Sequence, residues 1–192
     1  DVIVNPKQEG CPYPFKNLCG AAVAWKVVQC LYELFDIEWE ASLEFLEQTA
    51  IATVGDVMDL TEENRILVKE GLKKLNHTTN PGLHALIQAN GLEQAQLNAY
   101  HIGFVLGPCI NASGRLDTAK RALSLLLEEN AEKAAALAQE LKELNDERKD
   151  MTAKGVEQAV ELIENGPLKE DKVLVVYLPG CHESLAGIIA GR

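Results

Sequence analysis

Residues 107–117 form the stretch of this chain best suited to bind an anion. The segment reads Gly-Pro-Cys-Ile-Asn-Ala-Ser-Gly-Arg-Leu-Asp, and its two glycines and proline predict a sharp turn that can approach a ligand closely. Asn111, Ser113 and Arg115 supply hydrogen-bond donors, and the permanently charged guanidinium of Arg115 is suited to a phosphate. The residues alone leave two interpretations open, a helix-to-helix loop with an Asn or Ser cap and a phosphate-binding loop.

Asp56 is a candidate metal ligand. It follows Gly55 where a helical pattern breaks, and carboxylate oxygens are the ligands that Mg²⁺ and Mn²⁺ prefer. The alternative is a capping loop, which we favour for Asp59 because that residue precedes Thr61 and a new helical pattern. One carboxylate cannot hold a catalytic metal pair, so a site at Asp56 needs ligands from elsewhere.

His182 lies between a predicted strand and a predicted helix. The N–H groups at a helix N-terminus favour an anion, and a histidine in the turn can donate to it; packing within the turn is the alternative. The chain carries no Gly-x-Ser-x-Gly and no phosphate-binding Gly-rich Lys-Ser/Thr loop, and no histidine pair has metal-binding spacing. The sequence therefore does not favour nucleophilic catalysis.

The apolar spacing predicts a mostly helical protein of α/β class. Helical patterns cover residues 20–35, 41–52, a stretch after Thr61, 83–89, 92–106, 118–127 and 130–165. The last is predicted to be one helix of roughly 50 Å that ends at Gly166-Pro167. Residues 173–177 form the only strong strand pattern, and their continuous apolar run favours a parallel strand at the start of a second domain.

In the first helix, the stripe predicted to face the core is Ala24, Val27, Val28, Leu31 and Leu34.

Composition limits the kinds of partner. The formal net charge of −11 argues against an extended nucleic-acid surface, although it leaves room for a local phosphate site. No apolar run has the length of a membrane span, and no signal peptide opens the chain. The five cysteines lack zinc-type pairing, which predicts reduced thiols in the cytoplasm. The chain begins without Met and ends inside an apolar helical pattern, so we expect an internal fragment.

Taken in order, the segments of this chain resemble the RecJ family of single-strand-specific 5′→3′ exonucleases, within the DHH phosphoesterase superfamily. The matching segments are residues 2–8, 11–16, 18–21, 52–57, 60–65, 107–117, 144–148 and 182–192. Each is short, but the ordered set is specific and covers essentially the whole chain.

The resemblance implies a fold and a division into domains. Residues 1–129 correspond to the C-terminal portion of a DHH catalytic domain, and residues 130–166 to a long connecting helix. Residues 167–192 correspond to the start of a DHH-associated substrate-binding domain, with its first strand, turn and helix. The substrate, single-stranded DNA, would lie in the cleft between the two domains.

The resemblance also implies a reaction in which a pair of divalent metals, Mn²⁺ or Mg²⁺, activates water to attack a phosphodiester. Asp56 matches a metal-ligand carboxylate of the family. Asn111 and Arg115 match the loop that faces the substrate phosphate, and His182 and Arg192 match the substrate-binding motif of the second domain.

Two departures from the family limit what this chain can do alone. The Asp-His-His triplet and the other upstream metal motifs are absent, so the fragment is predicted to be inactive. Cys109 stands where relatives often carry arginine, which puts one cationic substrate contact in doubt. Two other functions stay open, a DHH-type phosphodiesterase for oligonucleotides or cyclic dinucleotides and a noncatalytic helical module that docks a partner through its acidic long helix.

Overall fold

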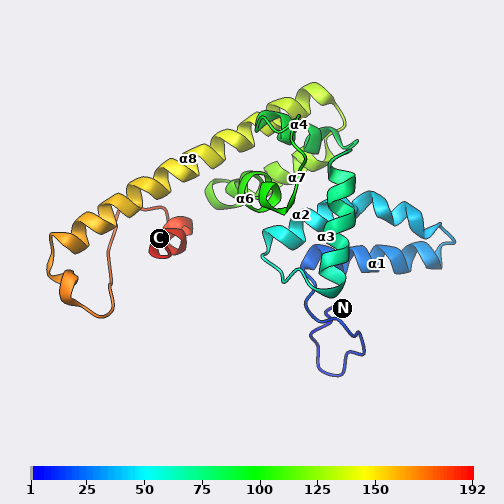
Figure 1. Cartoon of the computed structure of the whole chain (residues 1–192), viewed down its shortest axis with the longest axis horizontal. Coiled ribbons are helices and arrows are strands. Elements are labelled where there is room, and N and C mark those ends of the chain that lie inside the picture. The colour runs from blue at the N-terminus through cyan, green and yellow to red at the C-terminus, as the bar shows by residue number, and fades with distance from the viewer. Residues whose placement is uncertain (1) are drawn as a thin grey trace.

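The computed structural model describes residues 2–192, which fold into helices with longer non-helical segments at residues 2–19 and 171–182 (Figure 1). The first half contains α1 (Gly20–Leu34), η1 (Trp39–Phe45), α2 (Leu46–Gly55), α3 (Glu62–Leu75) and α4 (Pro81–Ala89). The second contains α5 (Ala99–His101), η2 (Ile102–Leu106), α6 (Gly107–Leu116), α7 (Lys120–Leu127), α8 (Ala131–Glu164), η3 (Pro167–Glu170), η4 (Glu183–Leu185) and α9 (Ala186–Ala190). The prediction of a mostly helical fold is confirmed.

Residues 173–177 form no strand, contrary to the sequence pattern. Among residues 2–192 no strand is assigned, and this segment runs as extended chain with Val173, Val175 and Tyr177 at least three-quarters exposed. A strand needs a partner to take up its backbone N–H and C=O groups, and no described segment lies beside this one to do so. The apolar pattern therefore reflects a preference for strand structure, but the described residues provide no partner strand for it.

The turn predicted at residues 107–117 is also wrong, because this segment is helix α6. One continuous helical stretch runs through α5, the π-helical turn η2 and α6. Asn98 begins it with its side chain accepting from the N–H of Tyr100 and His101, so the helix predicted from residue 92 starts later. Pro108 is tolerated because it falls in the first turn of α6, directly after the wider π turn.

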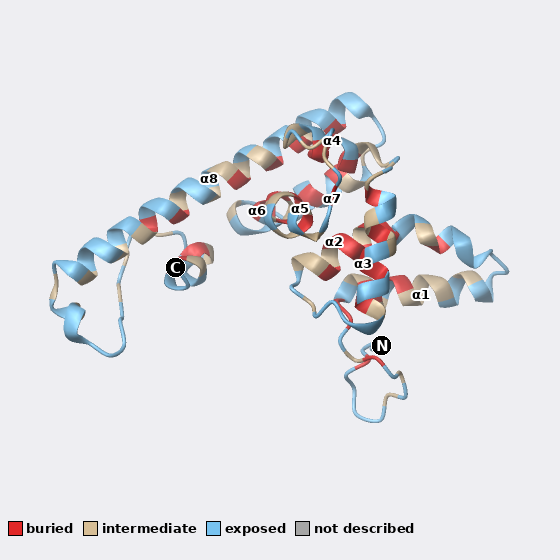
Figure 2. Cartoon of the chain, viewed as in Figure 1, coloured by how far each residue is buried: buried red, intermediate tan, exposed pale blue. Residues whose placement is uncertain are grey.

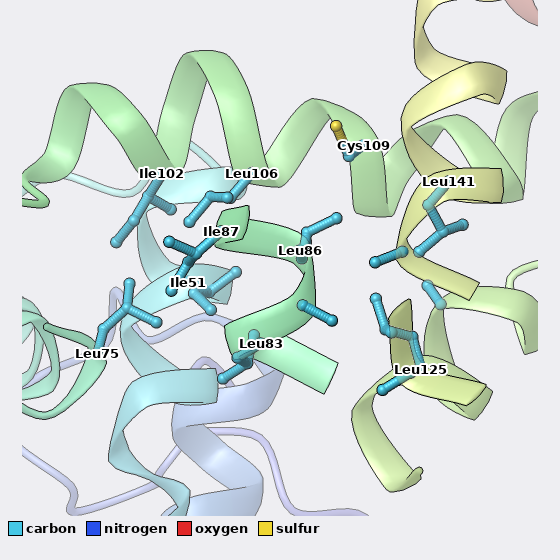
Figure 3. Packing of buried hydrophobic residues seen from close by; sticks show 14 of the residues in the cluster. Ile51, Leu75, Leu83, Leu86, Ile87, Ile102, Leu106, Cys109, Leu125 and Leu141 are labelled. Atoms are coloured by element: carbon cyan, nitrogen blue, oxygen red, sulfur yellow. The ribbon is translucent and has the colours of Figure 1, made fainter. Parts of the chain in front are cut away.

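Two clusters of buried apolar side chains hold the helices together. The larger joins α2, the end of α3, α4, the helical stretch 99–116, α7 and the first half of α8 (Figure 3), and its largest fully buried members are Leu75, Leu83, Leu86, Ile102, Leu106, Leu125 and Leu141. The smaller ties the N-terminal segment to α1, α2 and α3 through Phe15, Leu18, Cys19, Ala22, Trp25, Leu46 and Leu67.

The long helix is confirmed as α8, with Asn130 as its N-cap. The Asn130 side chain accepts a hydrogen bond from the Lys133 N–H at 3.0 Å, which satisfies one of the free donors at the helix start. The first half of α8 packs on α4, α6 and α7, and the second half carries the C-terminal segment. There a Cβ on Gly155 would lie 2.4 Å from Ile189 Cδ1, so the absent side chain lets α9 approach α8 closely.

The apolar stripe predicted for the first helix is not its buried face. Helix α1 buries Ala22 and Trp25, while Leu34 is 77% exposed and Phe35 after it 71% exposed. Figure 2 shows the far end of α1 mostly in the exposed colour. None of the helices between residues 2 and 192 combines the length and the apolar character that crossing a bilayer requires.

Candidate anion and metal-ligand sites

Asp56 lies at the C-terminal cap of α2 with its side chain exposed. Its N–H donates to the Ala52 carbonyl at 2.8 Å, and among the described residues no hydrogen bond or ion pair engages its carboxylate. No group of three or more His, Cys, Asp or Glu side chains that could hold a metal forms within residues 2–192. The chain therefore offers one free oxygen ligand, which fits Mg²⁺ or Mn²⁺ chemically but does not complete a site.

Asn64 anchors the loop that follows Asp56 through hydrogen bonds. The sequence pattern assigned no role to this residue. Asn64 is fully buried in the first turn of α3. Its Nδ2 donates to the carbonyl of Asn17 at 2.7 Å and to that of Asp59 at 3.0 Å. One side chain thus joins the Asp56 loop to the N-terminal segment. In the sequence, a polar residue at a core-facing position of an amphipathic helix is the pattern that could have indicated this anchoring role of Asn64.

Asn111 and Arg115 lie four residues apart on α6, and both are exposed. Residues at this spacing share one face of a helix, so the two side chains point to the same side. Arg115 Nη1 donates to the carbonyl of Ser184 at 3.1 Å, across a separation of 69 residues. Arg115 on α6 is therefore in contact with the C-terminal segment.

His182 begins the turn that Arg115 contacts. Its Nδ1 accepts from the Ser184 N–H at 3.4 Å and lies 2.8 Å from Ser184 Oγ. With Nδ1 accepting from the backbone, the neutral ring carries its proton on Nε2, which leaves that N–H as a donor. Ser184 contacts both Arg115 and His182, so the structure brings these two predicted residues to one place.

Arg148 adds a third guanidinium, at a position that continues the helical spacing of Leu137, Leu141 and Leu144 in the sequence. Burial lowers the pKa of Arg148 most, and the nearby positive charges of Arg115 and Arg192 lower it further. Its Nε and Nη2 donate to Asn145 Oδ1 at 3.2 and 3.1 Å, and no described carboxylate pairs with any of the three arginines. These cations, on α6, on α8 and just after α9, are candidates for binding an anion.

Cys109 does not replace the missing cation. Its side chain is fully buried in the larger core cluster, and its Sγ donates to Asn90 Oδ1 at 3.6 Å (Figure 3). Burial raises the pKa of this thiol, so it stays neutral at physiological pH. On α8, the buried Asn145 accepts from Arg148, whose guanidinium is half-buried.

Comparison with known proteins finds relatives that match almost the whole chain. No protein-family model matches the chain. It is 38% identical over 191 residues to the single-stranded-DNA-specific exonuclease RecJ of Bacillus subtilis, covering 99% of the chain and 23% of that protein. It is 34% identical over 205 residues to RecJ of Escherichia coli, covering all of the chain and 36% of that protein.

Two crystal structures match the fold as well as the sequence. The chain superimposes with a TM-score of 0.82 and 34% identity on RecJ of Thermus thermophilus in complex with Mg²⁺, covering 94% of the chain and 28% of that structure. The chain belongs to the RecJ family. An exonuclease RecJ bound to manganese matches with the same TM-score at 33% identity, over 94% of the chain and 45% of that structure. The chain spans about a quarter to a third of the length of these curated RecJ relatives.

Proposed function

We propose that this chain is part of a metal-dependent exonuclease that hydrolyses single-stranded DNA from the 5′ end in cytoplasmic DNA repair and recombination. The observation that carries the proposal is the contact of Arg115 with Ser184, which also contacts His182, so that two of the predicted phosphate-binding residues meet. The positive charges of Arg115 and Arg192 also act on Arg148, in a chain whose net charge is −11. Like charges gather at one place against their own repulsion when a ligand of opposite sign binds there. The RecJ relatives, which are named for single-stranded DNA, make a DNA phosphate that ligand.

Each residue of the site has a distinct task in this proposal. The guanidiniums of Arg115, Arg148 and Arg192 bind phosphate oxygens, and their planar donor sets fix the direction of the backbone. His182 donates from Nε2, and Asn111 supplies an amide donor on the same helix face as Arg115. Together these residues hold the strand without reading its bases, as expected for an enzyme that acts on any sequence.

Asp56 is proposed as one ligand of a divalent metal pair, Mn²⁺ or Mg²⁺, since two RecJ structures of the family hold these ions. Such a pair lowers the pKa of bound water and neutralises charge on the phosphate during displacement. The exposed, unpaired carboxylate of Asp56 can bind without breaking another contact. The remaining ligands must come from other parts of the protein, so we propose that residues 1–192 alone are inactive.

The proposed domain division follows the helices. Residues 1–129 form the C-terminal portion of a DHH catalytic domain, residues 130–166 the connecting helix, and residues 167–192 the start of the substrate-binding domain. In this division Asp56 and Asn111 belong to the first domain and His182 and Arg192 to the second. The phosphate site then spans both, with Arg148 contributed by the connecting helix.

The test is an Asp56→Ala substitution in the full-length protein. We expect the loss of Mn²⁺-dependent degradation of 5′-labelled single-stranded DNA while circular dichroism and the melting temperature stay unchanged. Unchanged activity would refute the ligand role. Di- and trinucleotides tested beside long strands separate an exonuclease from a phosphodiesterase for short substrates, and robust degradation by residues 1–192 alone would refute the proposed inactivity.

A further inference from the structure

Three helices of this chain end in the same hydrogen-bonded motif. In each, the third residue past the helix donates its N–H to a carbonyl five residues earlier, and the residue before it donates to a carbonyl three residues earlier. The bonds are Ile37 to Tyr32 and Asp36 to Glu33 after α1, Met58 to Thr53 and Val57 to Val54 after α2, and Leu92 to Ile87 and Gly91 to Gln88 after α4.

The residue at the turn of this motif must adopt a left-handed backbone conformation. Gly91 has a φ of 67°, Asp36 of 53° and Val57 of 55°. Glycine adopts this conformation without cost, and aspartate is among the residues that tolerate it. Valine is among the residues that oppose it most, because its branched Cβ crowds the neighbouring carbonyl. The cap of α2 therefore carries the unfavourable residue where α4 carries the favourable one.

No contact within the described residues compensates for the strain at Val57. Its side chain is 87% exposed, so it gains almost nothing from packing. The neighbouring residues, by contrast, are firmly held. Met58 packs against the smaller core cluster, and the Asp59 carbonyl accepts from the buried Asn64. The surroundings thus impose the conformation of Val57, as is typical of strain kept at a functional site.

Val57 directly follows Asp56, the exposed carboxylate at the end of α2. We propose that Val57 is a positioning residue for Asp56 as a metal ligand, an inference that rests on the proposed function. A valine held in the left-handed region has little room to vary φ and ψ, and it leaves that region only by breaking both hydrogen bonds of the cap. Glycine at the same position samples several regions freely, so the direction of the preceding carboxylate would vary.

The experiment compares Val57→Gly with Asp36→Gly in the full-length protein. Both substitutions relieve a left-handed residue in the same motif, but only the first adjoins Asp56, so Asp36→Gly is a matched control. The first readout is Mn²⁺ affinity, from electron paramagnetic resonance of free Mn²⁺ during titration without DNA. The second is the melting temperature in the presence of chelator. Val57→Ala, which keeps the strained backbone but removes the branch, is the companion variant.

We expect Val57→Gly to weaken Mn²⁺ affinity by about tenfold, as loss of a residue that supports a metal ligand does. Its melting temperature should match or exceed that of the unaltered protein. Asp36→Gly should leave Mn²⁺ affinity unchanged, and Val57→Ala should lie between. Unaltered Mn²⁺ affinity in Val57→Gly would overturn the inference, as would a clear fall in its melting temperature, because the valine would then be a packing residue of the whole protein.

An Asp56→Asn variant separates this inference from the function on which it rests. If Asp56→Asn loses Mn²⁺ affinity and Val57→Gly does not, the ligand role stands and the positioning role of Val57 fails. If Asp56→Asn binds Mn²⁺ as well as the unaltered protein does, the ligand role itself fails.

Discussion

Replacing Gly71 with alanine should destabilise the protein, because α2 and α3 touch at this glycine. A Cβ on Gly71 would lie 2.4 Å from Ala50 Cβ and 2.5 Å from the backbone oxygen of Leu46. Non-bonded heavy atoms are comfortable at about 3.5 Å or more, so the two helices must separate by about 1 Å. The clash with a backbone oxygen cannot be relieved by a side-chain rotation.

The expected magnitude is the difference of two effects. Overpacking of this kind costs about 3 kcal/mol. Alanine in a helix recovers about 1 kcal/mol relative to glycine, so the net loss is about 2 kcal/mol. For a chain of this size that loss lowers the melting temperature by roughly 4–8 °C. Thermal and urea unfolding, followed by circular dichroism at the helical band, measure it.

Gly55 provides the control, since it lies at the end of α2, the helix that Gly71 of α3 contacts. No heavy atom lies within 4 Å of a Cβ built on Gly55, so Gly55→Ala should leave stability unchanged or raise it by up to about 1 kcal/mol. If Gly71→Ala is as stable as the unaltered protein while Gly55→Ala behaves as expected, the close approach of α2 and α3 is refuted.

Three further changes probe other contacts. Arg115→Ala should weaken binding of single-stranded DNA, measured by fluorescence anisotropy, with little change in melting temperature, because the side chain is exposed; a large drop would mark a structural arginine. Asn80→Ala should cost about 2 kcal/mol in urea unfolding, because the side chain both caps Leu83 N–H and donates to the Leu126 carbonyl; Asn80→Asp, which keeps the cap, should lose less. Burial raises the pKa of Glu47, so the folded state holds its proton to higher pH than the unfolded chain does. The resulting cost appears as pH rises above the ordinary carboxyl pKa of about 4.3, and Glu47→Gln should therefore stabilise the protein at pH 7.5 but not at pH 4.

Local signals predicted the long helix well and the stretch before it poorly. Asn130 and the Gly166-Pro167 pair mark the ends of α8 through capping chemistry, which depends on a few neighbouring residues. The segment 107–117 misled because its glycines and Pro108 indicate a turn. The π turn before Pro108 and the burial of this helix against α8 outweigh that local preference, and neither is visible in residue spacing.

Most members of the candidate site were proposed from the sequence, but their arrangement was not. The resemblance to RecJ assigned Arg115, His182 and Arg192 to phosphate binding, yet only the fold shows that Ser184 joins the first two. Arg148 was overlooked because helical periodicity treats it as one member of an inward stripe. A cation in such a stripe, three residues after an asparagine that can accept from it, is the pattern that would have distinguished it.

Because an α-helix rises and turns by a fixed amount per residue, the number of residues between the two packing regions of α8 sets the distance and the angle between them. Ala134 and Ala138 pack in the core at one end, and Gly155 receives Ile189 toward the other. One inserted residue between them would turn everything beyond it by about 100° and shift it by about 1.5 Å, carrying Arg148 away from α6. A loop absorbs such an insertion, but a helix packed at both ends does not. We therefore expect differences in length among members of the family to fall in the connections, while the number of residues in this part of the helix stays constant.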